Sequence, residues 1–201
     1  MKILVLDDIR NITEEELEND LMLLPDWRRA AAVRFKFLSG KVQCAKAYLL
    51  LRQALLEEYG IRDDGAFGYG ENGKPYLLRY PDIHFNLSHC KEAVMCAVDD
   101  HPVGCDIESL QRRPETALLK KTMSPSEQER VFSSDDPGLE FMKLWTVKEA
   151  VIKQSGEGLS RELADLLENG LSEGLALSTT AVPEKGYVYS VVHHSTKSGL
   201  T

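Results

Sequence analysis

The sequence predicts an α+β protein made of two similar halves that meet near residue 100. The order strand, helix, phenylalanine and long helix occurs once in each half of the chain. Arg52 lies 17 residues after Phe35. Glu149 lies at the same spacing after Phe132. Because 201 residues suffice for two small packed units, we predict similar α/β subdomains that form a pseudo-dimer within one chain, over 1–101 and 102–201.

Capping and turn residues set the limits of the elements in the first half. Thr13 and Glu16 precede an apolar periodic run with the spacing of a capping box. Gly60 follows the longest amphipathic run, as expected of a glycine after a helix. The segment 68–77 is rich in Gly, Asn and Pro, which predicts a loop. Periodicity predicts strands at 1–8, 83–90 and 92–100 and helices at 13–24, 26–37 and 39–60.

The second half carries the same kinds of signal. Ser124 followed by Pro125 predicts a helix start, and Gly156 predicts the end of the second long helix. The last few residues of the chain are expected to fray. The predicted elements are a strand at 101–109, helices at 124–132 and 139–156, a loop at 133–138, and a short helix with two strands within 163–195.

Composition excludes several classes of protein. No apolar run approaches the roughly 20 residues that span a bilayer, and the N-terminus has no signal-peptide pattern, so we expect a cytoplasmic protein without a membrane partner. The net charge of −8 argues against a nucleic-acid-binding protein. The four cysteines have no zinc-site or disulfide spacing and are expected to be reduced.

Positive charge is concentrated in one segment of this acidic chain. Residues 27–56 hold seven Lys or Arg and no acid, and both flanks are acidic. Such a segment suits a small polyanion or an acidic partner. A solvated helix face is the alternative that charge alone leaves open.

Two acids stand inside an apolar strand pattern over 102–109. Alternation places Asp106 and Glu108 on one face, about 7 Å apart. Two like charges are costly to bury unless a cation lies between them. Carboxylate oxygens suit Mg²⁺, Mn²⁺ or Ca²⁺ rather than zinc, and Gly104 on the same face is expected to leave space for the ligand. An exposed edge strand with solvated acids is the alternative.

The second long helix carries an acid and a base on a face that also carries apolar residues. Trp145, Glu149, Ile152 and Lys153 follow one another at i, i+4, i+7 and i+8. A surface ion pair between Glu149 and Lys153 is the simplest reading. Because the indole and the isoleucine should face the core, we interpret this stripe as part of a site.

Four motifs of this sequence occur in an order known from one enzyme family. They are "GKP" at 73–75, "FNLSHC" at 85–90, "GCDIE" at 104–108 and "WTVKEAVIKQSGEGL" at 145–159. Together they resemble the 4′-phosphopantetheinyl transferases of the longer, surfactin-synthetase-activating (Sfp-like) class. The basic segment also precedes these motifs where that class has a phosphate-binding region.

The resemblance implies a fold, an activity and a metal site. Enzymes of this family transfer the phosphopantetheine arm of coenzyme A to a serine of an apo acyl or peptidyl carrier protein and release adenosine 3′,5′-bisphosphate. Asp106, Glu108 and Glu149 match the acids that bind Mg²⁺, with Mn²⁺ as the alternative. Glu149 and Lys153 match the catalytic base and the lysine that neutralises the leaving group. A duplicated chain can build one site between its own halves, so a monomer is expected.

The resemblance also implies a set of coenzyme A contacts. Because Ala31 replaces a base that relatives often carry, the contacts of the 3′-phosphate are expected to shift to neighbouring arginines. Cys90 likewise departs from the serine that is common at its position. The implied coenzyme A-binding residues are Arg28, Arg29, Arg34, Lys74, Pro75, Ser88, His89, Asp106, Lys148 and Lys153.

Two other functions remain open from the sequence. A non-catalytic module could bind coenzyme A or its carrier partner without transferring the arm. A different Mg²⁺-dependent nucleotide hydrolase would release a product without any carrier protein. The pathway of the carrier, in fatty acid, polyketide or nonribosomal peptide synthesis, is not specified by the motifs.

Overall fold

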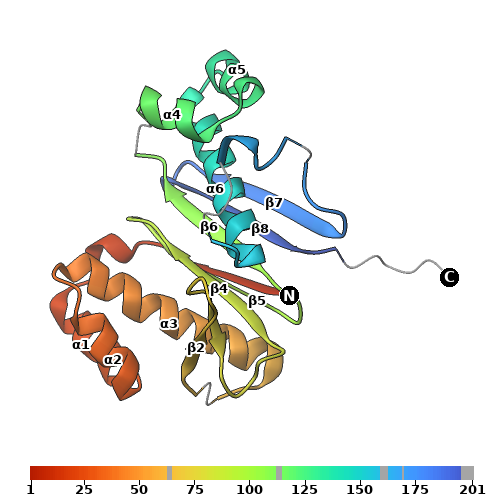
Figure 1. Ribbon diagram of the computed structural model, residues 1–201. Helices are drawn as coiled ribbons and strands as arrows, with labels where there is room; N and C mark the ends of the chain where they lie inside the picture. Colours follow the sequence, from red (N-terminus) through yellow and green to blue (C-terminus); the bar gives the residue numbers. More distant parts are fainter. Residues whose placement is uncertain (63–64, 112–114, 159–162, 169, 196–201) are drawn as a thin grey trace.

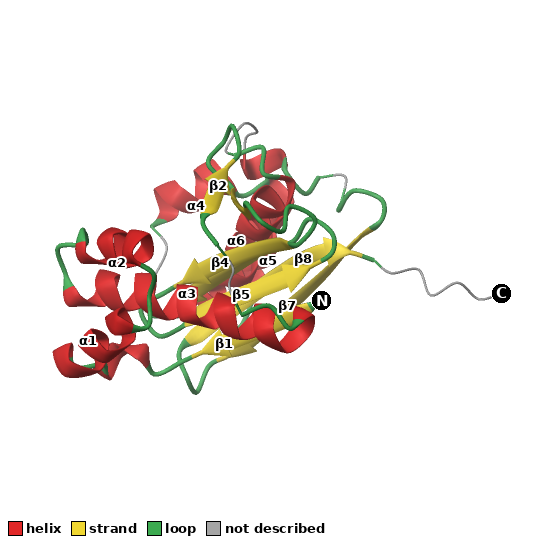
Figure 2. Cartoon of the chain, turned by 90° about the horizontal axis from the view of Figure 1, so that it is seen from below, coloured by secondary structure: helices red, strands yellow, loops and turns green. Residues whose placement is uncertain are grey.

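Two antiparallel sheets pack against each other between two long helices (Figure 1). The computed structural model describes residues 1–62, 65–111, 115–158, 163–168 and 170–195. We call residues 1–101 the N-terminal half and residues 102–201 the C-terminal half. Figure 2 shows helix α3 in front of the stacked strands, on the side opposite to α6.

The two three-stranded sheets have equivalent strand orders. In the first sheet β5 (Val94–Asp99) lies between β1 (Lys2–Leu6) and β4 (His84–His89). In the second sheet β8 (Tyr187–His194) lies between β6 (Gly104–Ser109) and β7 (Leu175–Val182). In each sheet the strand that comes last in the sequence is therefore central, and all pairs are antiparallel.

Helices cover the outer faces of both sheets. The helix α3 (Leu38–Tyr59) packs on the first sheet and α6 (Pro137–Ser155) on the second. Shorter helices flank them: α1 (Glu14–Met22), α2 (Asp26–Val33), α4 (Thr116–Thr122) and α5 (Pro125–Ser133), with single turns η1 (Ile9–Asn11) and η2 (Leu163–Asp165). None of the helices in the described ranges is both long and apolar enough to cross a membrane.

Side-chain alternation along the central strands builds the layers. On β5, Val94, Cys96 and Val98 are buried against α3, whereas Met95 and Ala97 are buried between the two sheets. This period of two places successive side chains in different cores. The strand β5 therefore joins both halves, and β4 beside it is brought next to β6.

The structure confirms the predicted caps and corrects two elements. Thr13 and Ser124 both form capping boxes, with Glu16 and Glu127. The predicted helix over 26–37 is too long, because α2 ends at Val33. The Phe35 ring fills the space beside Gly40, where a Cβ would lie 2.8 Å from it, so the chain turns before α3 begins.

The predicted loop at 68–77 contains a short hairpin. Its strands are β2 (Phe67–Tyr69) and β3 (Pro75–Leu77), each only three residues long. Gly73 has φ of 79°, which only glycine adopts readily in this turn. The predicted frayed end, residues 196–201, lies outside the described residues.

Candidate active site

A pocket of about 340 Å³ lies where α6 crosses β6 near the end of β4. It unites six of the residues that the sequence predicted for the site, and they come from both halves of the chain. Two further pockets are larger, about 600 and 490 Å³, but neither combines lysines with carboxylates. The residues lining the 340 Å³ pocket are Leu87, Ser88, His89, Asp106, Glu108, Trp145, Glu149 and Lys153.

A buried hydrogen-bond network occupies the centre of this pocket. Ser88 Oγ donates to Asp106 Oδ1 at 2.8 Å. Lys153 Nζ donates to the same carboxylate oxygen at 2.5 Å and to Ser88 Oγ at 3.2 Å. In this arrangement the ammonium group balances the charge of a carboxylate that is almost completely buried.

The remaining acids lie around this pair. Trp145 Nε1 donates to Glu108 Oε1 at 3.1 Å, which orients the Glu108 carboxylate. Burial, together with the negative charge of Asp106, raises the pKa of Glu149 above its usual range, although Lys153 opposes this shift. Burial lowers the pKa of Lys153, but the charge and hydrogen bond of Asp106 raise it more, so the net shift is upward.

The chemistry of the acids fits a hard cation. Asp106 Oδ2 is buried and has no hydrogen-bond partner among the described residues, so one oxygen of this carboxylate lacks a partner. All three acids predicted as ligands line the same pocket. Within the described ranges, no three His, Cys, Asp or Glu side chains already form a group that could hold a metal ion.

Gly104 has a different role from the one expected. A Cβ at this position would lie 2.1 Å from the Ala150 carbonyl oxygen and 2.3 Å from the Gln154 backbone nitrogen. The missing side chain therefore makes room for α6 rather than for a ligand. This close approach brings Glu149 and Lys153 of the helix onto the strand that carries Asp106.

Lys148 does not join the residues of the pocket. Its side chain is fully buried, and Nζ donates to Glu127 Oε2 at 2.7 Å and to the carbonyl oxygens of Thr122 and Leu163 at 3.0 and 2.6 Å. Adjacent helical residues point about 100° apart, so Lys148 faces α4, α5 and η2 while Glu149 faces the pocket.

The GKP lysine is also engaged outside the pocket. Lys74 Nζ donates to the carbonyl oxygens of Val103 and Gln154, at 3.2 and 2.8 Å. Pro75, which opens β3, does not line the pocket. His89 does line it, at the exposed end of β4.

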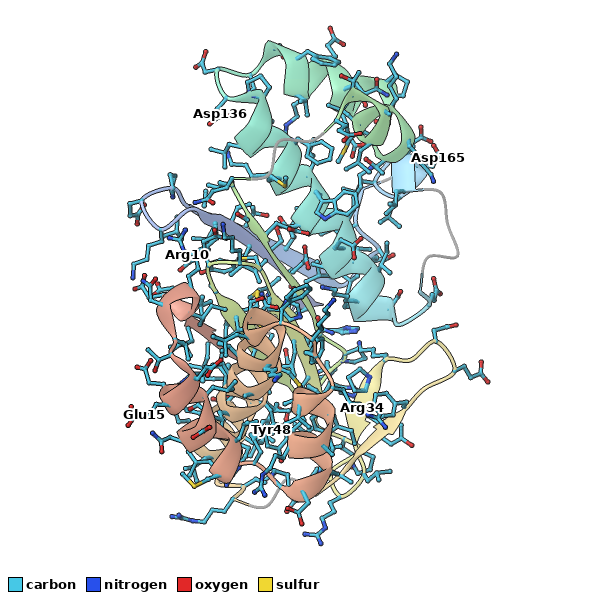
Figure 3. The ribbon with its side chains drawn as sticks, turned by 90° about the vertical axis from the view of Figure 1, so that its left-hand side faces the viewer. Arg10, Glu15, Arg34, Tyr48, Asp136 and Asp165 are labelled. Atoms are coloured by element: carbon cyan, nitrogen blue, oxygen red, sulfur yellow. The ribbon has the colours of Figure 1, made fainter. Side chains whose placement is uncertain are left out.

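Two of the three predicted phosphate-binding arginines make contacts within the N-terminal half. The Arg28 guanidinium donates to the Cys44 carbonyl oxygen and lies 5.6 Å from the centre of the Tyr48 ring, which Figure 3 places among the helices of this half. Arg29 donates to the carbonyl oxygens of Leu21 and Leu24. Arg34 is exposed, and its guanidinium forms no ion pair or hydrogen bond with a described residue.

Asn86 was not predicted from the sequence as a residue that joins the two halves beside the site. Its side-chain oxygen accepts the backbone N–H of Cys105 at 2.9 Å, just as Ser88 Oγ accepts that of Ile107 at 3.3 Å. The alternation of "FNLSH" gave the signal, because it places both polar side chains on one face of a strand.

Comparisons with known proteins match the segment that carries β6 and α6. A family model described as the 4′-phosphopantetheinyl transferase superfamily matches residues 102–192, which include the acids of β6 and the whole of α6. The 4′-phosphopantetheinyl transferase Sfp of Bacillus subtilis strain 168 is 32% identical over 158 residues, 77% of this chain and 70% of that protein.

This chain belongs to the 4′-phosphopantetheinyl transferase superfamily.

Two other relatives in the superfamily are more similar over shorter stretches. A 4′-phosphopantetheinyl transferase of Bacillus subtilis is 41% identical over 119 residues, and psf-1 of Bacillus pumilus is 36% identical over 152. This superfamily member matches 52% of the first protein and 65% of the second. The chain thus spans between half and two thirds of these relatives.

Proposed function

We propose that this chain transfers the 4′-phosphopantetheine arm of coenzyme A to a serine of an apo acyl or peptidyl carrier protein. The observation that carries the proposal is the pocket in which Asp106, Glu108, Glu149 and Lys153 come together. These are the positions that match the family's metal-binding and catalytic residues. Relatives named as 4′-phosphopantetheinyl transferases support it further.

Asp106, Glu108 and Glu149 would hold the divalent cation, Mg²⁺ or Mn²⁺. Hard carboxylate oxygens are ligands that both ions accept, and Asp106 Oδ2 is buried with no partner among the described residues. When bound, the cation would offset the negative charge of the coenzyme A pyrophosphate. The Trp145 indole N–H keeps one Glu108 oxygen engaged and so fixes the direction of that carboxylate.

Glu149 and Lys153 supply the acid–base and electrostatic parts of the reaction. Glu149 accepts the proton of the attacking serine hydroxyl, and its raised pKa suits a general base. As the serine oxygen bonds to the phosphorus of the pantetheine phosphate, the bond from that phosphorus to the oxygen of adenosine 3′,5′-bisphosphate breaks. Lys153 neutralises the charge that develops on this leaving oxygen.

Coenzyme A contacts are proposed at the pocket rim and on the basic segment. Ser88 and His89 line the pocket and remain candidates for phosphate contacts. Arg34 is the predicted arginine whose guanidinium is exposed and uses none of its donors on a described residue. Arg28, Arg29, Lys74 and Lys148 are held by contacts inside the protein.

We further propose that the two halves, 1–101 and 102–201, form a pseudo-dimer and that the protein works as a monomer. The identical strand order of the two sheets supports this arrangement. So does the position of the pocket, which takes Ser88 from one half and Asp106 from the other. One chain then supplies a complete site.

Mass spectrometry of a carrier protein tests the function. With coenzyme A and Mg²⁺, an apo-carrier should gain about 340 Da, the mass of the transferred arm. The Asp106→Ala variant, with its fold checked by circular dichroism, should give no gain. No gain on any of several apo-carriers with the wild-type protein would contradict the proposal. Coenzyme A binding without any such gain would support a binding module instead.

A further inference from the structure

The hairpin loop of the N-terminal half reaches the end of helix α6 in the other half. Lys74 Nζ lies 2.8 Å from the Gln154 carbonyl oxygen, and Asn72 Nδ2 lies 3.1 Å from that of Gly156. The last carbonyl groups of a helix have no donor within the helix. Asn72 and Lys74 therefore supply, from a distant segment, the donors that the end of α6 needs.

Lys74 also bonds to the strand on which α6 lies. Its ammonium donates to the Val103 carbonyl oxygen at 3.2 Å, immediately before Gly104. At Gly104 the strand and the helix approach so closely that a Cβ could not be accommodated. Lys74 thus bridges both partners of this crossing, and Gln154 adds a third link by donating to the Pro102 carbonyl oxygen at 3.2 Å.

The environment of Lys74 is that of a structural contact. The ammonium is half-buried and forms no ion pair with any carboxylate of the described residues, and its burial lowers the pKa to about 8. Its side-chain stem packs on the helix end, where Cδ lies 3.0 Å from the position of a Cβ on Gly156. The positive φ of 72° at Gly156 turns the chain there.

We propose that Lys74, assisted by Asn72, is a positioning residue that sets the placement of α6 and β6 relative to the N-terminal half. Gln154 directly follows Lys153, and Val103 precedes Asp106 by three residues. The two carbonyl groups held by Lys74 therefore lie within one and three residues of Lys153 and Asp106, the residues that must meet Ser88. This inference rests on the proposed transferase function.

A positioning role predicts a different kinetic defect from direct contact with the nucleotide. Loss of a contact with coenzyme A would raise KM for coenzyme A. Misplacement of α6 and β6 would lower kcat and leave this KM nearly unchanged, because small displacements of reacting groups slow the reaction strongly.

Steady-state kinetics of Lys74→Met and Asn72→Ala separate these cases. We expect Lys74→Met to lower kcat by at least about tenfold with less than about a twofold change in KM for coenzyme A. Asn72→Ala, a milder change, should lower kcat less. Lys74→Arg should recover part of the loss, because a guanidinium can donate to both carbonyl oxygens. The control Lys2→Met removes a lysine from a surface pair with Glu57 and should leave kcat unchanged.

The opposite pattern would overturn the inference. A large rise in KM for coenzyme A with kcat unchanged would show that Lys74 contacts the nucleotide. Unchanged kinetics in a folded variant would show that Lys74 has no role in the reaction. Hydrogen exchange provides a readout that does not depend on transfer. Amides of 104–107 should exchange faster in Lys74→Met than in the wild type, even if no carrier protein is modified, and equal exchange would contradict the inference.

Discussion

The hydroxyl group of Ser88, on β4, donates a 2.8 Å hydrogen bond to Asp106 Oδ1 on β6, across the junction of the two halves. Ser88 Oγ itself accepts hydrogen bonds from the Lys153 ammonium at 3.2 Å and from the Ile107 backbone N–H at 3.3 Å. One small side chain therefore forms hydrogen bonds with three polar groups, and two of them, on Asp106 and Ile107, belong to buried residues. It connects the packing of the two halves directly with the geometry of the site.

Replacing Ser88 with alanine should cost both stability and activity. The Ile107 N–H would lose its side-chain acceptor and Asp106 one donor, at a cost of about 1–3 kcal/mol in the free energy of unfolding. Urea denaturation measures this cost. Ser178→Ala, on the exposed part of β7, is the matched control and should change stability by less than about 0.5 kcal/mol. Equal effects of the two changes would contradict this account.

Replacing Glu149 with glutamine should abolish transfer without unfolding the protein. Removing a general base costs about 10²–10⁴ in rate. The metal-free variant should be at least as stable as the wild type, because Glu149 is half-buried beside the like charge of Asp106. Carrier modification and thermal melting measure the two effects. Glu129→Gln, at an exposed position of α5, should change neither, and rapid transfer by Glu149→Gln would exclude the proposed base.

Alanine at Gly104 should strongly destabilise the protein. Its Cβ would meet backbone atoms of Ala150 and Gln154 at 2.1 and 2.3 Å, and backbone cannot rotate away as a side chain can. We expect a loss of about 3 kcal/mol or more, measured by urea denaturation. Gly70→Ala is the control, because its nearest neighbour would be 3.7 Å from the new Cβ. A Gly104→Ala protein of wild-type stability would show that α6 can move off the strand.

Lys148→Met should reduce stability and leave the affinity for coenzyme A intact. The variant removes the cation beside Glu127, whose carboxylate still accepts the Ser124 N–H, and breaking a buried pair in this way costs about 3–5 kcal/mol. The double variant Lys148→Met/Glu127→Gln should recover part of that loss. In folded protein, KM for coenzyme A should stay within about twofold of the wild type. A large rise in this KM would show that Lys148 contacts coenzyme A after all.

The stability difference between the wild type and Lys74→Met should depend on pH. Burial lowers the pKa of Lys74 in the folded protein to about 8, from an unfolded value of 10.5. Between these values the unfolded chain binds more protons, so the stability of the wild type relative to the variant rises with pH. Below about pH 8, Lys74 is protonated in both the folded and the unfolded protein, so the stability difference between wild type and variant should be constant. Denaturation at a series of pH values measures it, and a flat difference up to pH 10.5 would contradict the lowered pKa.

Much of the fold follows from local signals in the sequence. The capping boxes at Thr13 and Ser124 and the glycines that end α3 and α6 all lie where local chemistry predicts them. The hairpin β2–β3 was missed because strands of three residues carry too little periodicity to distinguish them from a loop. The early end of α2 depends on the packing of Phe35 against Gly40, a tertiary contact that no local pattern records.

The acids of the site were easier to predict than the basic residues. Asp106 and Glu108 interrupt the apolar pattern of a strand, and Glu149 shares a helical face with Trp145. The sequence therefore shows charged residues at positions where apolar ones are expected. A long basic side chain gives no comparable signal. Lys148 is buried among carbonyl oxygens, and Arg29 binds the carbonyl oxygens at the end of α1. Charge alone cannot distinguish such internal contacts from contacts with a ligand.

The two side chains that join β4 to β6 have a consequence for how the chain can vary. Inside a sheet, backbone carbonyl oxygens accept the N–H groups, and any residue type provides a carbonyl. At this junction, the acceptors for the N–H groups of Cys105 and Ile107 are instead the side-chain oxygens of Asn86 and Ser88. These two links between the strands therefore depend on side chains, and a single substitution at Asn86 or Ser88 removes one of them while every backbone unit stays in place. Tolerance to mutation should be low at these two positions, whereas apolar residues of similar volume could be exchanged in the surrounding cores.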